Sequence, residues 1–511
     1  MKLVIPFIVS LLLVTACTFT PGKKGPGVFP PVESDYKSII VISDLHMTDK
    51  RALEGTIIPS TPQFNNIPFS SLSKNKEKIL QFIDWVIENK SWISEIVING
   101  DFFDEWAVPM QLNVIDSYES ESNFVKAIAN ANQDIIQGLK DIFEEGIKIT
   151  SVPGNHDMGV TKEDYQEIFD GCVDYITTYD KEGKTEDTKG LGTYYPKYFA
   201  KKTDSTQSSD GITRSSSSEK TLFDDITGLI AIEHGHRYDF WNCPDLYSNR
   251  VTNNDQLCDG NKVEGITNQT ILPIGFYVNR MIISQNLKEN YSASRSIANI
   301  DLEFTNEDYV YTSPTGDKIH SVYKNCWTAL KTSNLISSDI NYLYNDIDGF
   351  NGTYLTADYI PAKNDTRKIY IKAEYDSTWE AIKLLNNVAD PYADNLSYYN
   401  SATNMVFKSK LDESAKTQYF DLDPEVQVVV FGHTHNPKLQ TYNDKNHIYT
   451  NTGTWVDDTK TGSTFVVITP YVEDNNNKLL VGNYNFNSKD DIACNFKSLT
   501  AVLPLIRELT E

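Results

Sequence analysis

The chain has 511 residues, a formal net charge of -24 at pH 7 and a pI near 4.8. This acidic balance argues against a nucleic-acid-binding surface, which would need clustered lysine and arginine. An aromatic content of 12% argues against disorder, and the length allows one large or two smaller folded domains.

The N-terminal residues differ in composition from the rest of the chain. Lys2 precedes the apolar run Leu3–Val14, which is too short for a transmembrane helix and has the length of a signal-peptide core. The run ends in Val14-Thr15-Ala16-Cys17, which is similar to the lipobox whose cysteine becomes the acylated first residue of the mature protein. We therefore expect a signal peptide over residues 1–17 with lipidation at Cys17.

A tether should follow over residues 18–37, where four prolines and three glycines occur among few apolar residues. The mature protein would then be extracytoplasmic and anchored to a membrane by its lipid. Thr18 is not the aspartate associated with retention in the inner membrane, so the outer membrane is favoured. The alternative is an ordinary signal peptide and a secreted or periplasmic protein.

Strands and helices alternate in the first part of the body. Apolar runs predict strands over Ser38–Ser43, Glu95–Asn99 and Ile147–Val152. Helical spacing predicts helices over Ser73–Asn89 and over roughly Ser122–Glu145, where Gly146 provides the stop. This order is typical of an α/β domain, in which polar groups gather beyond the carboxyl ends of the strands.

Two further strand-like runs, Gly228–Glu233 and Val428–Phe431, are separated by roughly 200 residues. So long a gap is unusual inside a compact domain. We expect residues 240–425 to form an inserted cap or lid region, with residues 38–239 and 426–511 forming the main domain. After it, strands are predicted near residues 448–449, 465–468 and 479–484, and a final helix near Lys497–Leu509.

Metal-binding residue types follow all five of the main strand-like runs. Six of the eight histidines lie just past a strand end, as do Asp44, Asp101 and Asn155; the histidines are His46, His156, His234, His236, His433 and His435. At spacing two, His433 and His435 are expected to project to one side of an extended backbone. Imidazole and carboxylate without thiolate suit Mn, Fe or Zn, and there are enough ligands for two divalent ions.

Five ordered motifs make a family resemblance specific. They are Asp44-x-His46, Gly100-Asp101-x-x-Asp104, Gly154-Asn155-His156-Asp157, His234 and Gly432-His433-x-His435. In these motifs the chain is similar to the calcineurin-like metallophosphoesterase family, from about residue 38 to 470. The resemblance implies a four-layer α/β/β/α sandwich, and it leaves the insertion without a counterpart. It also implies hydrolysis of a phosphomonoester or phosphodiester by a hydroxide that bridges two metal ions.

The resemblance further implies a role for each residue. His156 would protonate the leaving oxygen or stabilise the transition state, and Asp104 would hold the His156 ring, an N-cap carboxylate being the alternative. The implied metal ligands are Asp44, His46 and His435 for the first ion, Asn155, His234 and His433 for the second, and Asp101 as the bridge between them.

Other neighbouring residues are assigned less directly. His236 is the alternative to His234 as a ligand, although the family pattern favours His234. Arg237 would either contact phosphate or form a surface ion pair, and Asp157 would brace its loop. Trp106 and Trp455 are expected to be core residues.

Departures from the family pattern indicate which branch of the family the chain resembles. Glu105 stands where protein Ser/Thr phosphatases of the family carry arginine. Residues 100–106, 234–239 and 451–455 instead resemble the branch that contains UDP-2,3-diacylglucosamine hydrolase. That enzyme is cytoplasmic and smaller, so we expect a different phosphoester substrate, either a small molecule or lipid-linked. The alternative function is a catalytically weak cell-surface binding lipoprotein on the same fold.

Overall fold

The computed structural model describes most of the main domain and small parts of the predicted insertion. The described residues are 29–48, 76–106, 121–177, 192–202, 222–238, 242, 310–312, 318–320, 341–347, 350–355, 411–442, 446–456 and 463–503. The predicted signal peptide with Cys17 and the side chain of Arg237 lie outside this part of the chain.

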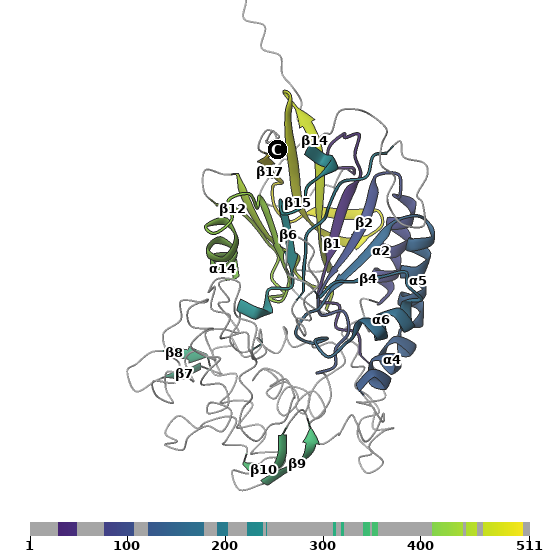
Figure 1. The fold of residues 1–511 in the computed structure, drawn as a ribbon, viewed down its shortest axis with the longest axis vertical. Helices are drawn as coiled ribbons and strands as arrows, with labels where there is room; N and C mark the ends of the chain where they lie inside the picture. Colours follow the sequence, from purple (N-terminus) through teal and green to yellow (C-terminus); the bar gives the residue numbers. More distant parts are fainter. Residues whose placement is uncertain are drawn as a thin grey trace, which may run out of the picture.

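The larger sheet combines parallel strands with an antiparallel hairpin (Figure 1). Its strands are β1 Ser38–Ile42, β2 Ile93–Asn99, β3 Lys148–Val152, β4 Asp174–Tyr175, β14 Ser463–Glu473, β15 Asn476–Ser488, β16 Asp491–Cys494 and β17 Leu499–Val502. They follow the order β16-β15-β14-β1-β2-β3-β4, and β17 pairs with β15. Because β1 to β4 run parallel, their carboxyl ends share one edge of the sheet.

The second sheet has five strands. They are β5 Thr193–Tyr194, β6 Ile230–Glu233, β11 Val428–Phe431, β12 Lys438–Tyr442 and β13 His447–Asn451. The order is β12-β13-β11-β6-β5, in which β6, β11 and β13 are parallel and the two edge strands are antiparallel to their neighbours. The strands that precede His234 and His433 therefore lie side by side, although roughly 200 residues separate them in sequence.

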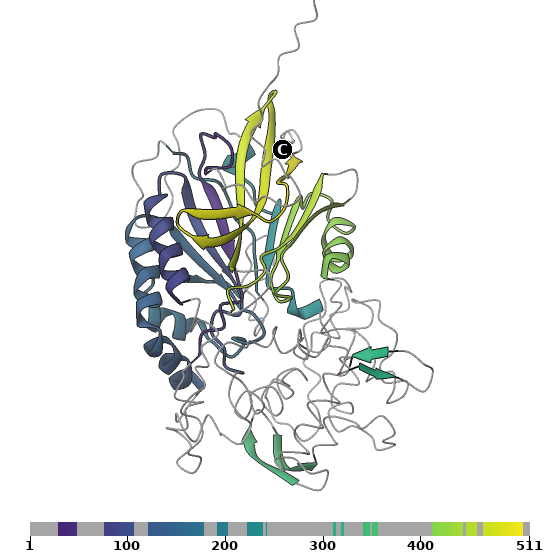
Figure 2. The same ribbon diagram turned by 180° about the vertical axis from the view of Figure 1, so that it is seen from behind.

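Helices cover both outer faces of the sandwich (Figure 2). Beside the larger sheet lie α2 Lys76–Glu88, α4 Glu121–Ala131, α5 Gln133–Glu144 and α6 Lys162–Phe169. Beside the second sheet lie α14 Leu411–Ala415 and the π-helical turn η5 Lys416–Phe420. The remaining described elements are the 3-10 turns η1 Leu222–Asp224 and η2 His236–Tyr238, and the hairpins β7 Val310–Thr312 with β8 Lys318–His320 and β9 Asn341–Ile347 with β10 Phe350–Leu355.

The alternation of side chains along β1 shows how the four layers pack. Ile40 and Ile42 join the core under the helices, whereas Ile39 and Val41 join the core between the two sheets. Both faces of the strand are buried, which explains its unbroken apolar sequence. The predicted four-layer α/β/β/α sandwich is therefore confirmed.

The single helix predicted over Ser122–Glu145 is two helices, because Asn132 interrupts it. Asn132 has φ -125° and ψ 34°, outside the helical region. Its buried side-chain amide donates to the carbonyl oxygens of Ile128 at 2.9 Å and of Thr48 at 3.3 Å. Such side-chain bonds to the backbone compete with helix formation. Since Thr48 follows the first metal-ligand motif, the break ties the helix layer to that loop.

The predicted final helix near Lys497–Leu509 is wrong in its described part. Leu499–Val502 forms β17, which pairs antiparallel with residues 478–481 of β15. Ala501 and Leu503 are buried between the sheets. Pairing with β15 and burial of every second side chain therefore decide the conformation of this segment, despite its helix-like spacing of apolar residues.

Residues 411–420 contribute to the sandwich, although the insertion is predicted to extend to residue 425. Leu411, Tyr419 and Phe420 pack with Val429 and Phe431 on the outer face of the second sheet. The extent of the insertion stays a prediction, since most of it lies outside the described residues. Within the described part of the chain, no helix is both long and apolar enough to span a membrane.

Candidate metal centre

The candidate ligands lie on loops at the carboxyl ends of parallel strands from both sheets. Five of them have a positive φ, a region that non-glycine residues seldom occupy; these are Asp44, His46, Asp101, His433 and His435. Only three other non-glycine residues of the described chain share this conformation. Left-handed backbone at functional loops is a recurrent form of stored strain. The gathering of positive φ values at the candidate ligands indicates that these loops adopt the conformation that brings their side chains together.

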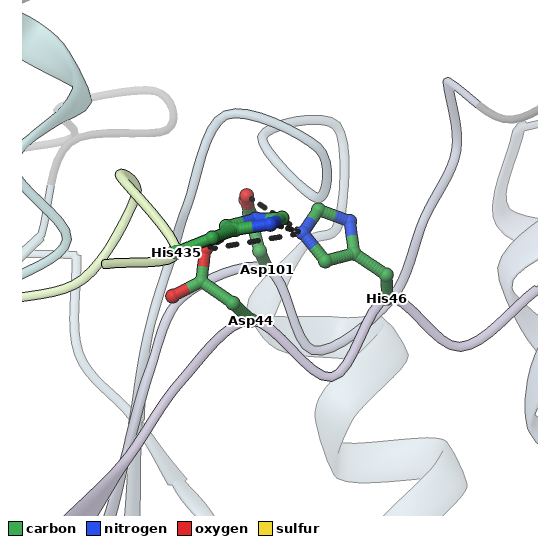
Figure 3. A group of neighbouring side chains, drawn as sticks. All are labelled: Asp44, His46, Asp101 and His435. Carbon is green, nitrogen blue, oxygen red and sulfur yellow. Dashed lines mark hydrogen bonds and ion pairs between the residues drawn. The ribbon is translucent and has the colours of Figure 1, made fainter. Parts of the chain in front are cut away.

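Four side chains converge from three strand ends (Figure 3). Asp44, His46, Asp101 and His435 each offer one ligand atom, and these atoms lie within 4.8 Å of one another. The Nε2 atoms of His46 and His435 are 3.0 Å apart, and His435 Nε2 lies 3.2 Å from Asp44 Oδ1. Two ligands that each bind an ion at ~2.1 Å and at right angles would lie ~3 Å apart. The donor set and its spacing therefore fit one divalent cation.

A second group shares Asp101 with the first. Asp101, His234 and His433 also offer atoms within 4.8 Å of one another. Asp101 Oδ2 lies 3.1 Å from His234 Nε2 and 3.6 Å from His46 Nε2, so it faces both groups. The other oxygen, Oδ1, accepts the backbone N–H of His156 at 2.9 Å. That bond fixes the carboxylate in the orientation a bridging ligand needs.

Three of the candidate ligand atoms at this centre are buried without a hydrogen bond in the described structure. They are Asp44 Oδ1, Asn155 Oδ1 and His234 Nε2. An unsatisfied buried polar atom costs ~1–3 kcal/mol, so each one calls for an explanation. All three belong to residues expected as ligands, and a bound cation would satisfy them.

The charges of the cluster also fit a cation. Burial disfavours the ionised form of Asp44, but His234 and His435 outweigh it and hold the pKa of Asp44 below its usual range. Burial likewise opposes ionisation of Asp101, and neighbouring histidines lower its pKa. For His234, burial acts to lower the pKa, but Asp101 and Asp44 raise it to about 9. The carboxylates are thus held ionised in a buried site that attracts positive charge.

Asp104 connects the first group to His156. Its Oδ1 accepts from His156 Nδ1 at 2.9 Å, and its Oδ2 accepts from His46 Nδ1 at 3.1 Å. These bonds direct the Nε2 atom of His46 towards Asp44 and Asp101. The expected contact with His156 is present, and the link to His46 is an addition that the sequence did not indicate.

A protein-family model matches the part of the chain that carries most of these residues. Residues 37–266 match the model of the calcineurin-like phosphoesterase family. This part of the chain is therefore similar to that family. The match includes the motifs as far as His234, and the structure adds His433 and His435 to the same centre from beyond it.

Solved structures also match this chain. Thirty chains match, among them Vps29 of Chaetomium thermophilum at 16% identity and a TM-score of 0.14. That match covers 19% of this chain and 50% of Vps29, so the chain spans half the length of that protein. No curated protein matches the chain.

The remaining predicted site residues of the main domain lie near the centre but differ in their contacts. Asn155 is buried beside His156, and His236 is buried with its ring centroid 5.5 Å from that of His234. His236 belongs to none of the ligand groups of the described chain, so the geometry favours His234. Asp157 accepts the backbone N–H groups of Phe102 at 2.9 Å and Gly154 at 2.6 Å, which is the predicted bracing role.

Sequence reasoning missed two residues at the centre. Asn242 accepts from Asn155 Nδ2 and approaches His433 Nε2, each at 3.5 Å. Trp106, expected as a core residue, is buried, but its ring stacks on the imidazole of His156. No motif could have identified Asn242, which belongs to the segment after β6. The position of Trp106 two residues after Asp104 was the available signal. Trp455 is a core residue as expected.

Replacing Gly154 by alanine should weaken metal binding. A Cβ atom at this position would lie 2.1 Å from Asp101 Oδ1 and 2.4 Å from the Asp101 backbone nitrogen, so the Asp101 carboxylate would have to move. We expect a ~10–100-fold loss of metal affinity, as for other groups that orient ligands. Titration of the metal-free protein with Mn²⁺ or Zn²⁺ would measure it.

Gly138→Ala is the matched control. Its Cβ would meet the methyl groups of the Ile83 side chain at 2.9–3.0 Å, in α5 and away from the centre. Its metal affinity should equal that of the unchanged protein. If Gly154→Ala also bound metal normally, the close support of Asp101 by this loop would be unimportant.

Proposed function

We propose that this chain hydrolyses a phosphoester with the help of two divalent metal ions, of which Mn, Fe and Zn are the candidates. The observation that carries the proposal is the pair of ligand groups that share Asp101 and lie beside His156. A structural metal site would need only one closed set of ligands. Paired groups around a shared carboxylate are instead suited to phosphoryl chemistry.

Each ligand has a proposed place. Two ions bound here would neutralise charge on the phosphoryl group and supply an activated water molecule. The first ion would be held by Asp44, His46 and His435, the second by Asn155, His234 and His433, and both by Asp101.

His156 is proposed to donate a proton to the leaving oxygen. Its Nδ1 is engaged by Asp104 at 2.9 Å, which leaves Nε2 as the atom that can face a substrate. Its side chain is largely buried, so the hydrogen bond to Asp104 is shielded from competing water. Asp104 would keep the ring in one orientation.

Metal content and activity should rise and fall together. We expect about two equivalents of metal by elemental analysis after reconstitution, and hydrolysis of a small aryl phosphoester that a chelator abolishes and metal restores. His447→Ala removes a buried histidine outside the ligand groups and should keep both properties. A persistent metal content near zero after reconstitution would contradict the centre. Full metal occupancy without hydrolysis of any ester would favour the binding lipoprotein instead.

The class of ester is the next question. A panel that compares phosphomonoesters with phosphodiesters in the presence of Mn²⁺ would decide it. The resemblance of residues 100–106 to the branch with UDP-2,3-diacylglucosamine hydrolase supports including lipid-linked phosphoesters beside small soluble ones. Faster turnover of a lipid-linked ester than of its water-soluble analogue would support a substrate at the membrane.

The proposed location is extracytoplasmic, with a lipid at Cys17. The support for it is the sequence around residues 2–17, where a basic residue, an apolar run and a lipobox-like end follow one another. Cys17→Ser should move the protein from the membrane fraction to the soluble fraction without changing its hydrolytic rate. An unchanged membrane fraction for this variant would contradict lipidation at Cys17, and the secreted alternative predicts a soluble protein in both cases.

A further inference from the structure

Trp106 is placed against the residue proposed to transfer the proton. The ring centroids of Trp106 and His156 are 4.3 Å apart, and their planes differ by 29°, so the rings are stacked. The Trp106 side chain is buried, with 2% exposure of the residue. The face of the imidazole is therefore covered by an indole that holds a fixed position.

One carboxylate oxygen links the two residues. Asp104 Oδ1 accepts the backbone N–H of Trp106 at 3.0 Å and the Nδ1–H of His156 at 2.9 Å. The same oxygen atom therefore holds the backbone of Trp106 and the ring of His156. A change in one would be felt by the other.

Trp106 also differs from the other buried tryptophans. Trp85, Trp92 and Trp455 belong to the apolar core under the helices. Trp106 belongs to none of the three apolar clusters of the described residues. Unlike those three, its ring lies against the imidazole of His156, and its backbone N–H donates to Asp104.

We propose that Trp106 is a positioning residue that fixes the direction of His156 Nε2. The inference rests on the proposed function. A hydrogen bond at Nδ1 still allows the imidazole to tilt about its Cβ–Cγ bond, and a stacked indole restricts this tilt. The ring of His46 meets His156 edge-on, at 4.6 Å between centroids and 87° between planes, and limits the ring from another side. A displacement of ~1 Å in a reacting group costs up to ~10²-fold in rate, so such restraint matters.

The test is a set of substitutions measured on a small aryl phosphoester. Trp106→Leu keeps an apolar side chain but removes the stack, and it should lower kcat roughly tenfold or more with metal content and KM unchanged. Trp106→Phe keeps a smaller aromatic face, and its loss should be only about threefold. This partial rescue by an aromatic ring is not expected if Trp106 only fills space, because leucine and phenylalanine both fill it.

A double-mutant cycle separates positioning from a general structural effect. If Trp106 acts through His156, then Trp106→Leu should cause no further loss in the His156→Ala background. Equal losses in both backgrounds, or wild-type kcat for Trp106→Leu, would overturn the inference. If circular dichroism shows that Trp106→Leu is not folded, the cycle is run with Trp106→Phe, whose loss should appear only when His156 is present. A loss in both backgrounds or in neither would then overturn it.

The proposed function fails in a different way. Wild-type protein without hydrolytic activity, or a His156→Ala variant as active as wild type, would contradict the role of His156 itself. Wild-type activity that depends on His156 but not on Trp106 would contradict this inference alone.

Discussion

Replacing Asp101 by alanine is expected to abolish metal binding at both groups and nearly all turnover. Asp101 Oδ2 faces His234 Nε2 at 3.1 Å and His46 Nε2 at 3.6 Å, so one substitution removes a ligand from each group. It also removes the acceptor for the His156 backbone N–H. Metal catalysis supplies several kcal/mol, so kcat/KM should fall on the order of 10³-fold or more.

Elemental analysis after reconstitution and steady-state kinetics would measure these two losses. Asp164→Ala is the matched control, because Asp164 is also a buried aspartate but caps α6 through Thr161. It should cost ~1 kcal/mol of stability and leave metal content intact. An Asp101→Ala protein that still held two equivalents of metal would show that Asp101 is no bridging ligand.

Replacing His156 by alanine should leave the metal content unchanged, in contrast to the replacement of Asp101. His156 contacts Asp104, Trp106 and His46 but offers no atom to the groups that contain Asp101. We expect two equivalents of metal to remain while kcat falls ~10²–10⁴-fold, the usual contribution of a general acid. The loss should be smallest for substrates with a good leaving group, which needs little protonation.

Kinetics on a series of aryl phosphoesters with leaving groups of rising pKa would measure this dependence. His447→Ala provides the control for loss of a buried histidine elsewhere, in which the contact of its Nε2 with the Pro424 carbonyl oxygen is the only described hydrogen bond at stake. If His156→Ala and Asp101→Ala lost metal to the same extent, the separation of acid from ligands would be wrong.

Much of the fold could be predicted because burial dictates the sequence of its central strands. Runs such as Ser38–Ile42 and Val428–Phe431 are buried on both faces, so they are apolar throughout and easily recognised. Edge elements carry no such signal. The strand at Leu499–Val502 was predicted as a helix, since only its pairing with β15 decides its conformation. The break at Asn132 likewise depends on a partner, Thr48, that is distant in sequence.

The sequence could predict which side chains of the candidate site lie close together, but not their geometry. Strand ends determined which side chains would meet, and the structure brings Asp44, His46 and His435 together as expected. The expectation that an extended backbone places His433 and His435 on one side is wrong, because both have left-handed φ values of 69° and 54°. They belong to different ligand groups, as the family resemblance implied. Spacing in sequence cannot reveal such a conformation, since it is imposed by the surrounding packing.

The left-handed conformation of the ligand loops has a consequence for the lifetime of the protein. Five non-glycine residues in this region cost on the order of 1 kcal/mol each, and a domain of this kind is stable by only ~5–15 kcal/mol. The proposed metal ions would bind the folded state and stabilise it by an amount that rises with the logarithm of their concentration. In a metal-poor compartment the unloaded chain would therefore open more often and be degraded sooner. Supply of metal would then set how much of the protein persists, before any substrate is met.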